Sequence, residues 1–145
     1  MGIAAISWWA VITAAVVKFV IGGIWYSPPV FGTEWQKLVG QTPEEMRAGL
    51  PRAMIAQAIG DLVMAYILAR FIAHYGTPSL ASGLLIGFMA WLGFVATVTV
   101  GQIFYEKRPW RLWLINNGYL LLGILVMGAI LGWWQGAPVA AVPAA

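Results

Sequence analysis

The sequence predicts an all-α integral membrane protein, a bundle of four transmembrane helices with short interfacial helices in the first loop. Three observations support this fold class. The 145 residues are 61% hydrophobic and 9% charged, whereas soluble domains carry about 25% charged residues and small ones leave much of their surface exposed. Four apolar segments have the length needed to cross a bilayer. Nine Trp and five Tyr residues match the aromatic belts found at membrane–water interfaces.

Each apolar segment meets the requirement of about 20 residues, at a rise of ~1.5 Å per residue, that a bilayer core imposes. The predicted helices cover residues 3–26, 53–75, 80–104 and 111–134. The first has no basic n-region and is longer than the apolar core of a signal peptide, so we expect it to be retained. Residues 1–136 thus form one four-helix domain, and residues 137–145 form an Ala/Pro/Val tail with no pattern of its own.

The connection after the first segment predicts short helices at the membrane surface. Pro28-Pro29 ends the first helix, because each proline lacks an N–H and clashes with the preceding turn. Residues 33–39 then place their apolar side chains on one helical face, as in an interfacial helix. The run Thr-Pro-Glu-Glu at 42–45 has the pattern of a capped helix start. The other two connections are short and make their flanking helices antiparallel.

The placement of Lys and Arg predicts the orientation in the membrane. Six basic residues belong to the first and third connections or their margins: Lys37, Arg47, Arg52, Lys107, Arg108 and Arg111. On the opposite side only Arg70 and the usually neutral His74 lie near the boundary. Because positive charge is retained in the cytoplasm, we expect the first loop inside the cytoplasm and both termini outside it.

Polar side chains inside the predicted helices fall into one slab in the cytoplasmic half of the bilayer. They are Lys18, Gln57, Asp61, Thr97, Asn116 and Asn117. Lys18 lies eight residues before Tyr26 and Asp61 eight after Ala53, so both lie about 12 Å deep. The pair is either a structural ion pair or a site for a proton, an ion or a headgroup, unless Lys18 snorkels to the interface. We favour the structural pair, because one carboxylate is little for a proton relay.

Small residues recur every four positions on three predicted helices, which lets backbones approach closely. The stripes are Gly93, Thr97 and Gly101 on the third helix, Gly128 and Gly132 on the fourth, and Ala65, Ala69 and Ala73 on the second. We expect these stripes to pack the bundle together. Gly83 and Gly87 lie one turn apart, and Gly83 is turned about 80° away from Gly93 in projection. We expect these two glycines to face a helix of another protein.

The residue content argues against catalysis, cofactors and nucleic acid. There is no Cys, which excludes thiolate chemistry and Cys-based metal sites. The only histidine, His74, has no second ligand for a haem and is expected to be an interfacial polar residue. We find no phosphate loop, nucleophile–base set or metal-ligand cluster, and the basic residues are too few and too close to the membrane for nucleic acid. We therefore predict a protein that is not an enzyme and holds no metal or cofactor.

Three motifs in the chain resemble those of a known family. They are Trp25-Tyr26-Ser27-Pro28 with Phe31-Gly32 and Trp35; Trp91-Leu92-Gly93-Phe94-Val95-Ala96-Thr97; and Glu106-x-Arg108-Pro109-Trp110 with Ile115-Asn116-x-Gly118-Tyr119 and Gly128-Ala129-Ile130-Leu131-Gly132. Their order and spacing resemble the bacterial membrane-protein family catalogued as domain of unknown function 1761, up to about Trp134. The resemblance implies a small four-helix protein of the bacterial inner membrane, with periplasmic termini by the charge rule above, and it implies no activity.

Two functions remain open after these exclusions. The leading hypothesis is a non-catalytic accessory or structural subunit that packs against a larger membrane complex or against itself. Small size, the lack of a catalytic set and a charge-free third helix favour it. The alternative is a small oligomeric transporter or channel that uses the polar slab of Lys18, Asp61, Asn116 and Asn117. In both cases the lipid bilayer is the immediate partner.

Overall fold

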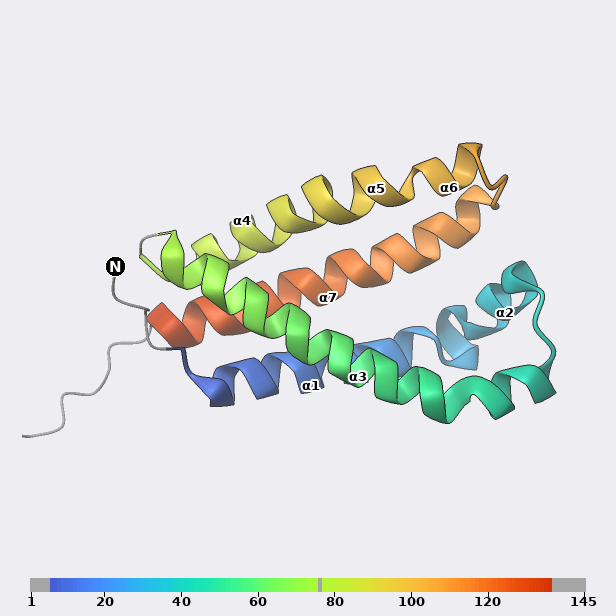
Figure 1. Cartoon of the computed structure of the whole chain (residues 1–145), viewed down its shortest axis with the longest axis horizontal. Helices are drawn as coiled ribbons and strands as arrows, with labels where there is room; N and C mark the ends of the chain where they lie inside the picture. The colour runs from blue at the N-terminus through green and yellow to red at the C-terminus, as the bar shows by residue number, and fades with distance from the viewer. Residues whose placement is uncertain (1–5, 76, 137–145) are drawn as a thin grey trace, which may run out of the picture.

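The computed structural model describes residues 6–75 and 77–136, and every regular element within them is helical (Figure 1). The predicted tail and the first residues of the first predicted helix lie outside the described residues. Four described segments are long and apolar enough to cross a membrane: Trp8–Trp25, Pro43–His74, Leu80–Phe104 and Trp110–Gly136. They correspond in order to the four predicted helices, and the all-α prediction is confirmed.

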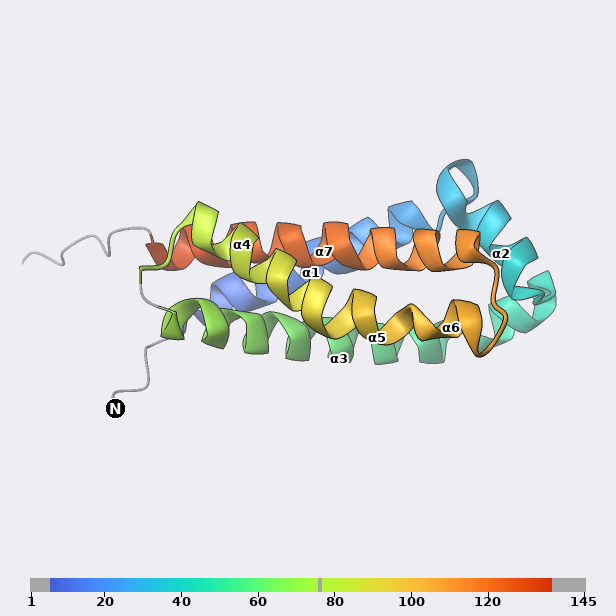
Figure 2. The same ribbon diagram turned by 90° about the horizontal axis from the view of Figure 1, so that it is seen from above.

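The four segments alternate in direction, so the connections alternate between the two ends of the bundle (Figure 1). The central helix is α7 (Trp110–Gly136), which contacts α1 (Trp8–Trp25), α3 (Pro43–His74) and α4 (Leu80–Trp91). Seen from above, α7 lies at one level and α3 at another, while α1 and the chain from α4 to α6 each cross between the levels (Figure 2). In the most apolar stretch of α7, 44% of the residues are buried, against 11% for Leu80–Phe104. The third segment is therefore held mainly along one side.

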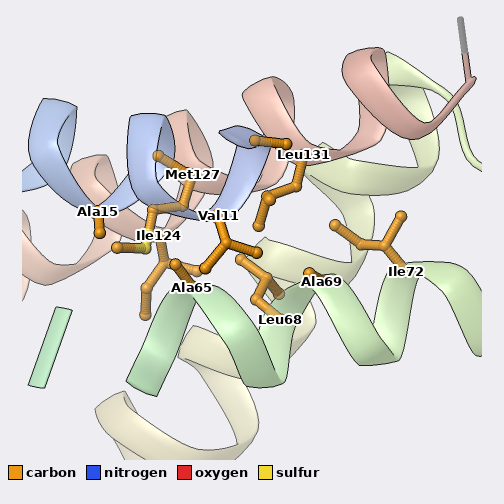
Figure 3. Close-up of a cluster of buried hydrophobic side chains, with 11 residues drawn as sticks. Val11, Ala15, Ala65, Leu68, Ala69, Ile72, Ile124, Met127 and Leu131 are labelled. Atoms are coloured by element: carbon orange, nitrogen blue, oxygen red, sulfur yellow. The ribbon is translucent and has the colours of Figure 1, made fainter. Parts of the chain in front are cut away.

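Side chains from α1, α3 and α7 form the core of the bundle (Figure 3). Val11, Leu68 and Met127, one from each helix, are at most 4% exposed. Between them α3 presents Ala65 and Ala69, both fully buried. Small side chains at these two positions let the helix backbones approach closely, in agreement with the predicted packing stripe.

The first connection contains the predicted short helix. The chain leaves α1 before the two prolines and passes through a π-helical turn, η1 (Pro28–Gly32), into α2 (Thr33–Val39). Gly40 ends α2 with a φ of 75°, a left-handed conformation that glycine adopts without strain. This connection lies at the end of the bundle where α3 and α7 begin (Figure 1).

The course of α3 corrects the prediction for the second helix. The sequence predicts a capped start that is separate from a transmembrane helix at 53–75, but one helix of 32 residues runs over Pro43–His74. The Thr42 hydroxyl accepts from the Glu45 N–H at 3.2 Å, and the Glu45 carboxylate accepts from the Thr42 N–H at 2.9 Å, which completes a capping box. Pro51 lies inside the helix among exposed residues, so the carbonyl that it leaves unpaired does not have to be buried.

The predicted helix at 80–104 is present but irregular. After α4 the chain passes through the π-helical turn η2 (Leu92–Ala96) and the short helices α5 (Thr97–Thr99) and α6 (Gly101–Phe104). Both threonine hydroxyls of α5 donate to the carbonyl four residues before them, at 2.8 and 2.7 Å, a pattern that bends helices. Because a π-helical turn takes in an extra residue, it changes which side chains of α5 face α7.

The prediction that Gly83 and Gly87 face another protein is wrong. Both are buried where α4 packs on α7. A Cβ added to Gly83 would overlap the carbonyl oxygen of Gly128, and one added to Gly87 would lie 3.0 Å from the carbonyl oxygen of Ile124. Gly132 also lies against Gly83. At these glycines α4 and α7 therefore pack so closely that an added methyl group would not fit.

Gly93 and Gly101 do not pack against another helix, contrary to the prediction. Nothing lies within 4 Å of the position that a Cβ would take on Gly93, which is exposed. Near Gly101 the only described atoms within that distance belong to the ring of Tyr105. Since α4 uses Gly83 and Gly87 to meet α7, the second stripe on the same segment is turned away from the contact.

Candidate functional site

A buried ion pair joins α1 to α3 inside the bundle. The Lys18 ammonium donates to Asp61 Oδ1 at 2.5 Å. The Lys18 side chain is 0% exposed and the Asp61 side chain 1%. Lys18 therefore does not extend to an interface, and the structure brings the two residues together as an ion pair. Of the three salt bridges among the described residues, this one joins buried side chains and the other two join exposed side chains.

Two further side chains complete this first group. The Tyr119 hydroxyl from α7 accepts from Lys18 at 3.0 Å, and the ammonium nitrogen lies 4.6 Å from the centre of the Tyr119 ring. Gln57, one turn before Asp61, donates its amide N–H to Asp61 Oδ1 at 2.8 Å. The second carboxylate oxygen, Oδ2, is buried and has no hydrogen-bond partner among the described residues. The four side chains thus tie together three of the four long helices.

Two glycines make room for the long side chains of this group. A Cβ on Gly123 would lie 2.9 Å from Cγ and Cε of Lys18. A Cβ on Gly22 would lie 2.8 Å from the Tyr119 hydroxyl oxygen. Both distances are shorter than ordinary carbon contacts of about 3.5–4.0 Å. Any residue other than glycine at positions 22 and 123 would therefore fill the space that the tyrosine hydroxyl and the lysine stem now occupy.

Asn116 organises a second group, which fastens the first connection onto α7. Its side-chain oxygen accepts from the Tyr26 hydroxyl and from the Trp35 indole, each at 3.0 Å. Burial, with a smaller contribution from neighbouring Tyr119, raises the pKa of Tyr26 above its ordinary value, so the phenol remains a donor at physiological pH. The rings of Tyr26 and Tyr119 meet edge to face at 5.3 Å, which places this group next to the ion pair.

We predict that Asn116→Leu releases α2 from the bundle. The substitution removes the acceptor of the hydrogen bond from Trp35, which lies in α2. Such a bond is worth about 1 kcal/mol, so the population with α2 detached should rise about fivefold. Tryptic cleavage after Lys37, which lies in α2, measures that population. Thr97→Val is the control, because the Thr97 hydroxyl bonds only within its own segment. An unchanged cleavage rate in the Asn116 variant would contradict the role of this group.

A third group surrounds Asn117 and joins α5 to α7. The Asn117 side-chain oxygen lies 3.1 Å from the Thr99 hydroxyl oxygen and shares that hydroxyl's single hydrogen with the Val95 carbonyl. The Asn117 amide donates to the Trp113 carbonyl at 3.2 Å. The Trp113 indole donates to Thr99 Oγ1 at 3.1 Å. The Trp91 indole donates to the backbone carbonyl of Asn117 at 3.2 Å. These bonds hold the irregular part of the third segment to the central helix.

The structure therefore divides the predicted polar slab into three groups and changes its membership. Lys18, Gln57 and Asp61 come together as predicted, but Asn116 and Asn117 belong to separate groups. Thr97 belongs to none of them, because it is exposed and bonds to its own helix. Thr99, which lies at the predicted depth of the slab, is a member of the third group. The sequence reasoning missed Tyr26, Trp35, Trp113 and Tyr119 as members. A signal was present, since hydroxyl and indole groups lie at the same predicted depth as the amides.

The first group holds two opposite charges that cancel within the bundle. Removing a charge from water is costly unless it is paired, and this pair leaves no net charge in the apolar interior. The group of side chains therefore fixes the relative positions of α1, α3 and α7. Among residues 6–75 and 77–136, no set of three or more His, Cys, Asp or Glu side chains is placed to hold a metal ion.

Comparison with known proteins identifies the family. A family model described as Protein of unknown function (DUF1761) matches residues 9–132. This range includes all members of the three polar groups and the glycines of the contact between α4 and α7. No curated protein and no solved structure is detectably similar to the chain. The resemblance found in the sequence motifs is confirmed by the family match, and the chain belongs to the DUF1761 family.

Proposed function

We propose that this protein is a non-catalytic accessory protein of the bacterial inner membrane, which acts by packing against other membrane helices. The observation that carries the proposal is the exposure of the first half of α3. From Pro43 to Gly60, every residue is exposed except Met46 and Ala58, which are half-buried. The described residues 6–75 and 77–136 leave this half of α3 uncovered.

The composition of that uncovered half favours a protein helix as its neighbour. Gly49, Ala53, Ala56 and Gly60 follow a spacing of four, three and four residues, which places them on one stripe of the helix. Nothing lies within 4 Å of a Cβ built on Gly49 or Gly60. Small residues at the surface of a membrane helix let a second helix approach closely. Gln57, which is exposed beside this stripe, carries an amide able to bond across such a contact.

The simplest occupant of the stripe is a second copy of this chain. In a pair related by a two-fold axis along the membrane normal, each small residue meets its equivalent from the partner. The heptad-like spacing of the stripe is the one that keeps two such helices in contact over several turns. Packing in a larger complex then starts from this dimer.

We predict that Ala56→Cys forms disulfide-linked dimers in native membranes under mild oxidation. The chain has no Cys of its own, so between two copies of this chain the new thiol can pair only with its equivalent, and the product has twice the mass of the monomer. Ile55→Cys is the matched control, because Ile55 is 62% exposed on the same turn but points about 100° away from the stripe. Equal cross-linking at the two positions would contradict the proposed interface. Non-reducing electrophoresis is the measurement.

Orientation in the inner membrane is part of the same proposal. The six basic residues used for the charge rule lie in α2, at the start of α3, between α6 and α7, or at the start of α7, all at one end of the bundle (Figure 1). We predict that a cysteine at Gln41 reacts with a membrane-impermeant maleimide from the cytoplasmic side only, and one at Thr77 from the opposite side only. Permeabilised cells provide the control for reactivity. Labelling of both from one side would contradict the orientation.

A second candidate function is transport of protons or ions by an oligomer. The observation in its favour is the depth and burial of the Lys18–Asp61 pair, since ionisable groups at such positions often serve transport. Proteoliposomes with an internal pH-sensitive dye distinguish the two functions. A proton leak that is present in the wild type and lost in Asp61→Asn supports transport, and identical rates in both, equal to those of empty liposomes, support the accessory function.

A further inference from the structure

The hydrogen-bonding groups around the buried ion pair do not balance within the protein. Asp61 Oδ1 accepts two donors, while Oδ2 accepts none from the described residues. The Tyr119 hydroxyl accepts from Lys18, so its own hydrogen must point elsewhere. The Lys18 ammonium has three N–H groups, of which two have partners in the described protein. One acceptor and two donors thus remain around a single buried pair.

An unmatched carboxylate oxygen in an apolar interior is costly, because it has lost its hydrogen bonds to water and has gained none from the protein. The group that would satisfy it has a defined chemistry. It must donate a hydrogen bond to Oδ2 and accept one from Lys18 or Tyr119. It must carry no charge, because Lys18 and Asp61 already cancel and any further charge would stand unpaired in the bundle. A neutral hydroxyl meets all three conditions.

The packing limits the size of that hydroxyl compound. Lys18 and Asp61 are 0% exposed, and at Gly123 and Gly22 even a Cβ would come closer than 3.0 Å to the lysine stem or the tyrosine hydroxyl, so the hydroxyl that reaches Oδ2 must belong to a very small molecule. A buried water needs about the volume of one probe sphere and two to four polar partners. The unmatched groups of the ion pair supply three.

We propose that the Lys18–Asp61 pair binds one buried water molecule. The water donates to Asp61 Oδ2 and accepts from Lys18 Nζ or the Tyr119 hydroxyl, and so closes a hydrogen-bonded ring that includes α1, α3 and α7. The ring gives both carboxylate oxygens hydrogen-bond donors, although the carboxylate is buried and has no access to bulk water. The protein then carries a hydrated ion pair in a bundle whose neighbouring side chains are apolar.

Solid-state NMR on the full-length protein in phosphatidylcholine bilayers tests this site. In a water-edited experiment, magnetisation should pass from bound water to the Asp61 carboxyl carbon and to Lys18 Nζ. The internal control is the core residue Leu131, which is 0% exposed and has no polar group, so its side-chain carbons should receive at least severalfold less. The double variant Lys18→Met, Asp61→Leu should show no transfer to position 61 while its spectrum remains that of a folded bundle.

Two results would overturn the proposal. The first is the absence of transfer to the Asp61 carboxyl carbon in the folded wild type, at mixing times that reach the carboxylate of exposed Glu34. The second is transfer that appears only when phosphatidylglycerol, whose headgroup carries free hydroxyls, replaces phosphatidylcholine. That result would assign the hydroxyl to a lipid and not to water. Persistence of the transfer in phosphatidylcholine supports bound water.

Discussion

Gly83→Ala is expected to destabilise the bundle by about 3 kcal/mol, at the upper end of the cost of overpacking. The added methyl group would overlap the carbonyl oxygen of Gly128. Backbone atoms cannot avoid it by changing rotamer, so α4 must move away from α7. Because α7 supplies most of the contacts that hold the third segment, the whole segment should loosen. Circular dichroism during titration with a denaturing detergent measures the loss in free energy of unfolding.

The matched control lies on the same segment. Nothing is within 4 Å of a Cβ on Gly93, so Gly93→Ala should leave the stability unchanged or raise it by up to about 1 kcal/mol, the gain in helix propensity. Gly128→Ala should resemble Gly83→Ala, because its methyl group would overlap the carbonyl oxygen of Gly83. Similar stabilities for the Gly83 and Gly93 variants would contradict the close contact between α4 and α7.

The local features of the fold were predictable because short stretches of sequence determine them. Pro28-Pro29 ends α1, and Thr42 with Glu45 caps α3, whatever the rest of the chain does. The length of α3 was not predictable in the same way, because Pro51 locally disfavours a helix. The exposure of its surroundings lets the helix continue through it.

The choice of helix face could not be predicted from the sequence of a segment alone. Two sets of small residues lie on Leu80–Phe104, and either set is suited to close packing. Which one meets α7 depends on the position of α7. Gly83 lies against Gly128 and Gly132 of α7, and Gly87 lies against the backbone of Ile124. The same limit explains why Thr99 and not Thr97 reaches Asn117. The π-helical turn just before these two threonines changes the direction in which the following side chains point, and no residue pattern in the sequence predicts that turn.

The ion pair could be predicted in part. Lys18 and Asp61 lie at equal depth from the same end, and depth follows from counting residues. The surroundings that decide its strength come from other helices. Tyr119 reaches Lys18 because Gly22 and Gly123 leave room for both side chains. This role of the two glycines could not be predicted from the sequence, because a glycine in an apolar helix can serve many purposes.

Breaking this pair is expected to have the largest effect of any single polar substitution in the chain. Lys18→Met leaves the Asp61 carboxylate without its cation, and Asp61→Leu leaves the Lys18 ammonium without its anion, both in a site that is 0% exposed. Removing one partner of a buried pair costs about 3–5 kcal/mol, because the remaining charge is uncompensated. Each single variant should lose this amount of stability in detergent-induced unfolding, or fail to accumulate in the membrane.

The double variant Lys18→Met, Asp61→Leu should recover most of the loss. Both new side chains are apolar, and methionine is close to lysine in volume, whereas leucine is larger than aspartate. Apolar replacements of buried pairs are often neutral or stabilising, so the removal of the uncompensated charge should outweigh the added volume. The pairwise free energy from the double-mutant cycle should therefore exceed about 2 kcal/mol, well above the ~0.5 kcal/mol found for independent sites. Lys37→Met serves as the control for loss of a lysine, because Lys37 is exposed on α2 and should change stability by less than about 0.5 kcal/mol. Strictly additive losses would show that the two charges do not stabilise each other, and the three helices would then be held together by apolar packing alone.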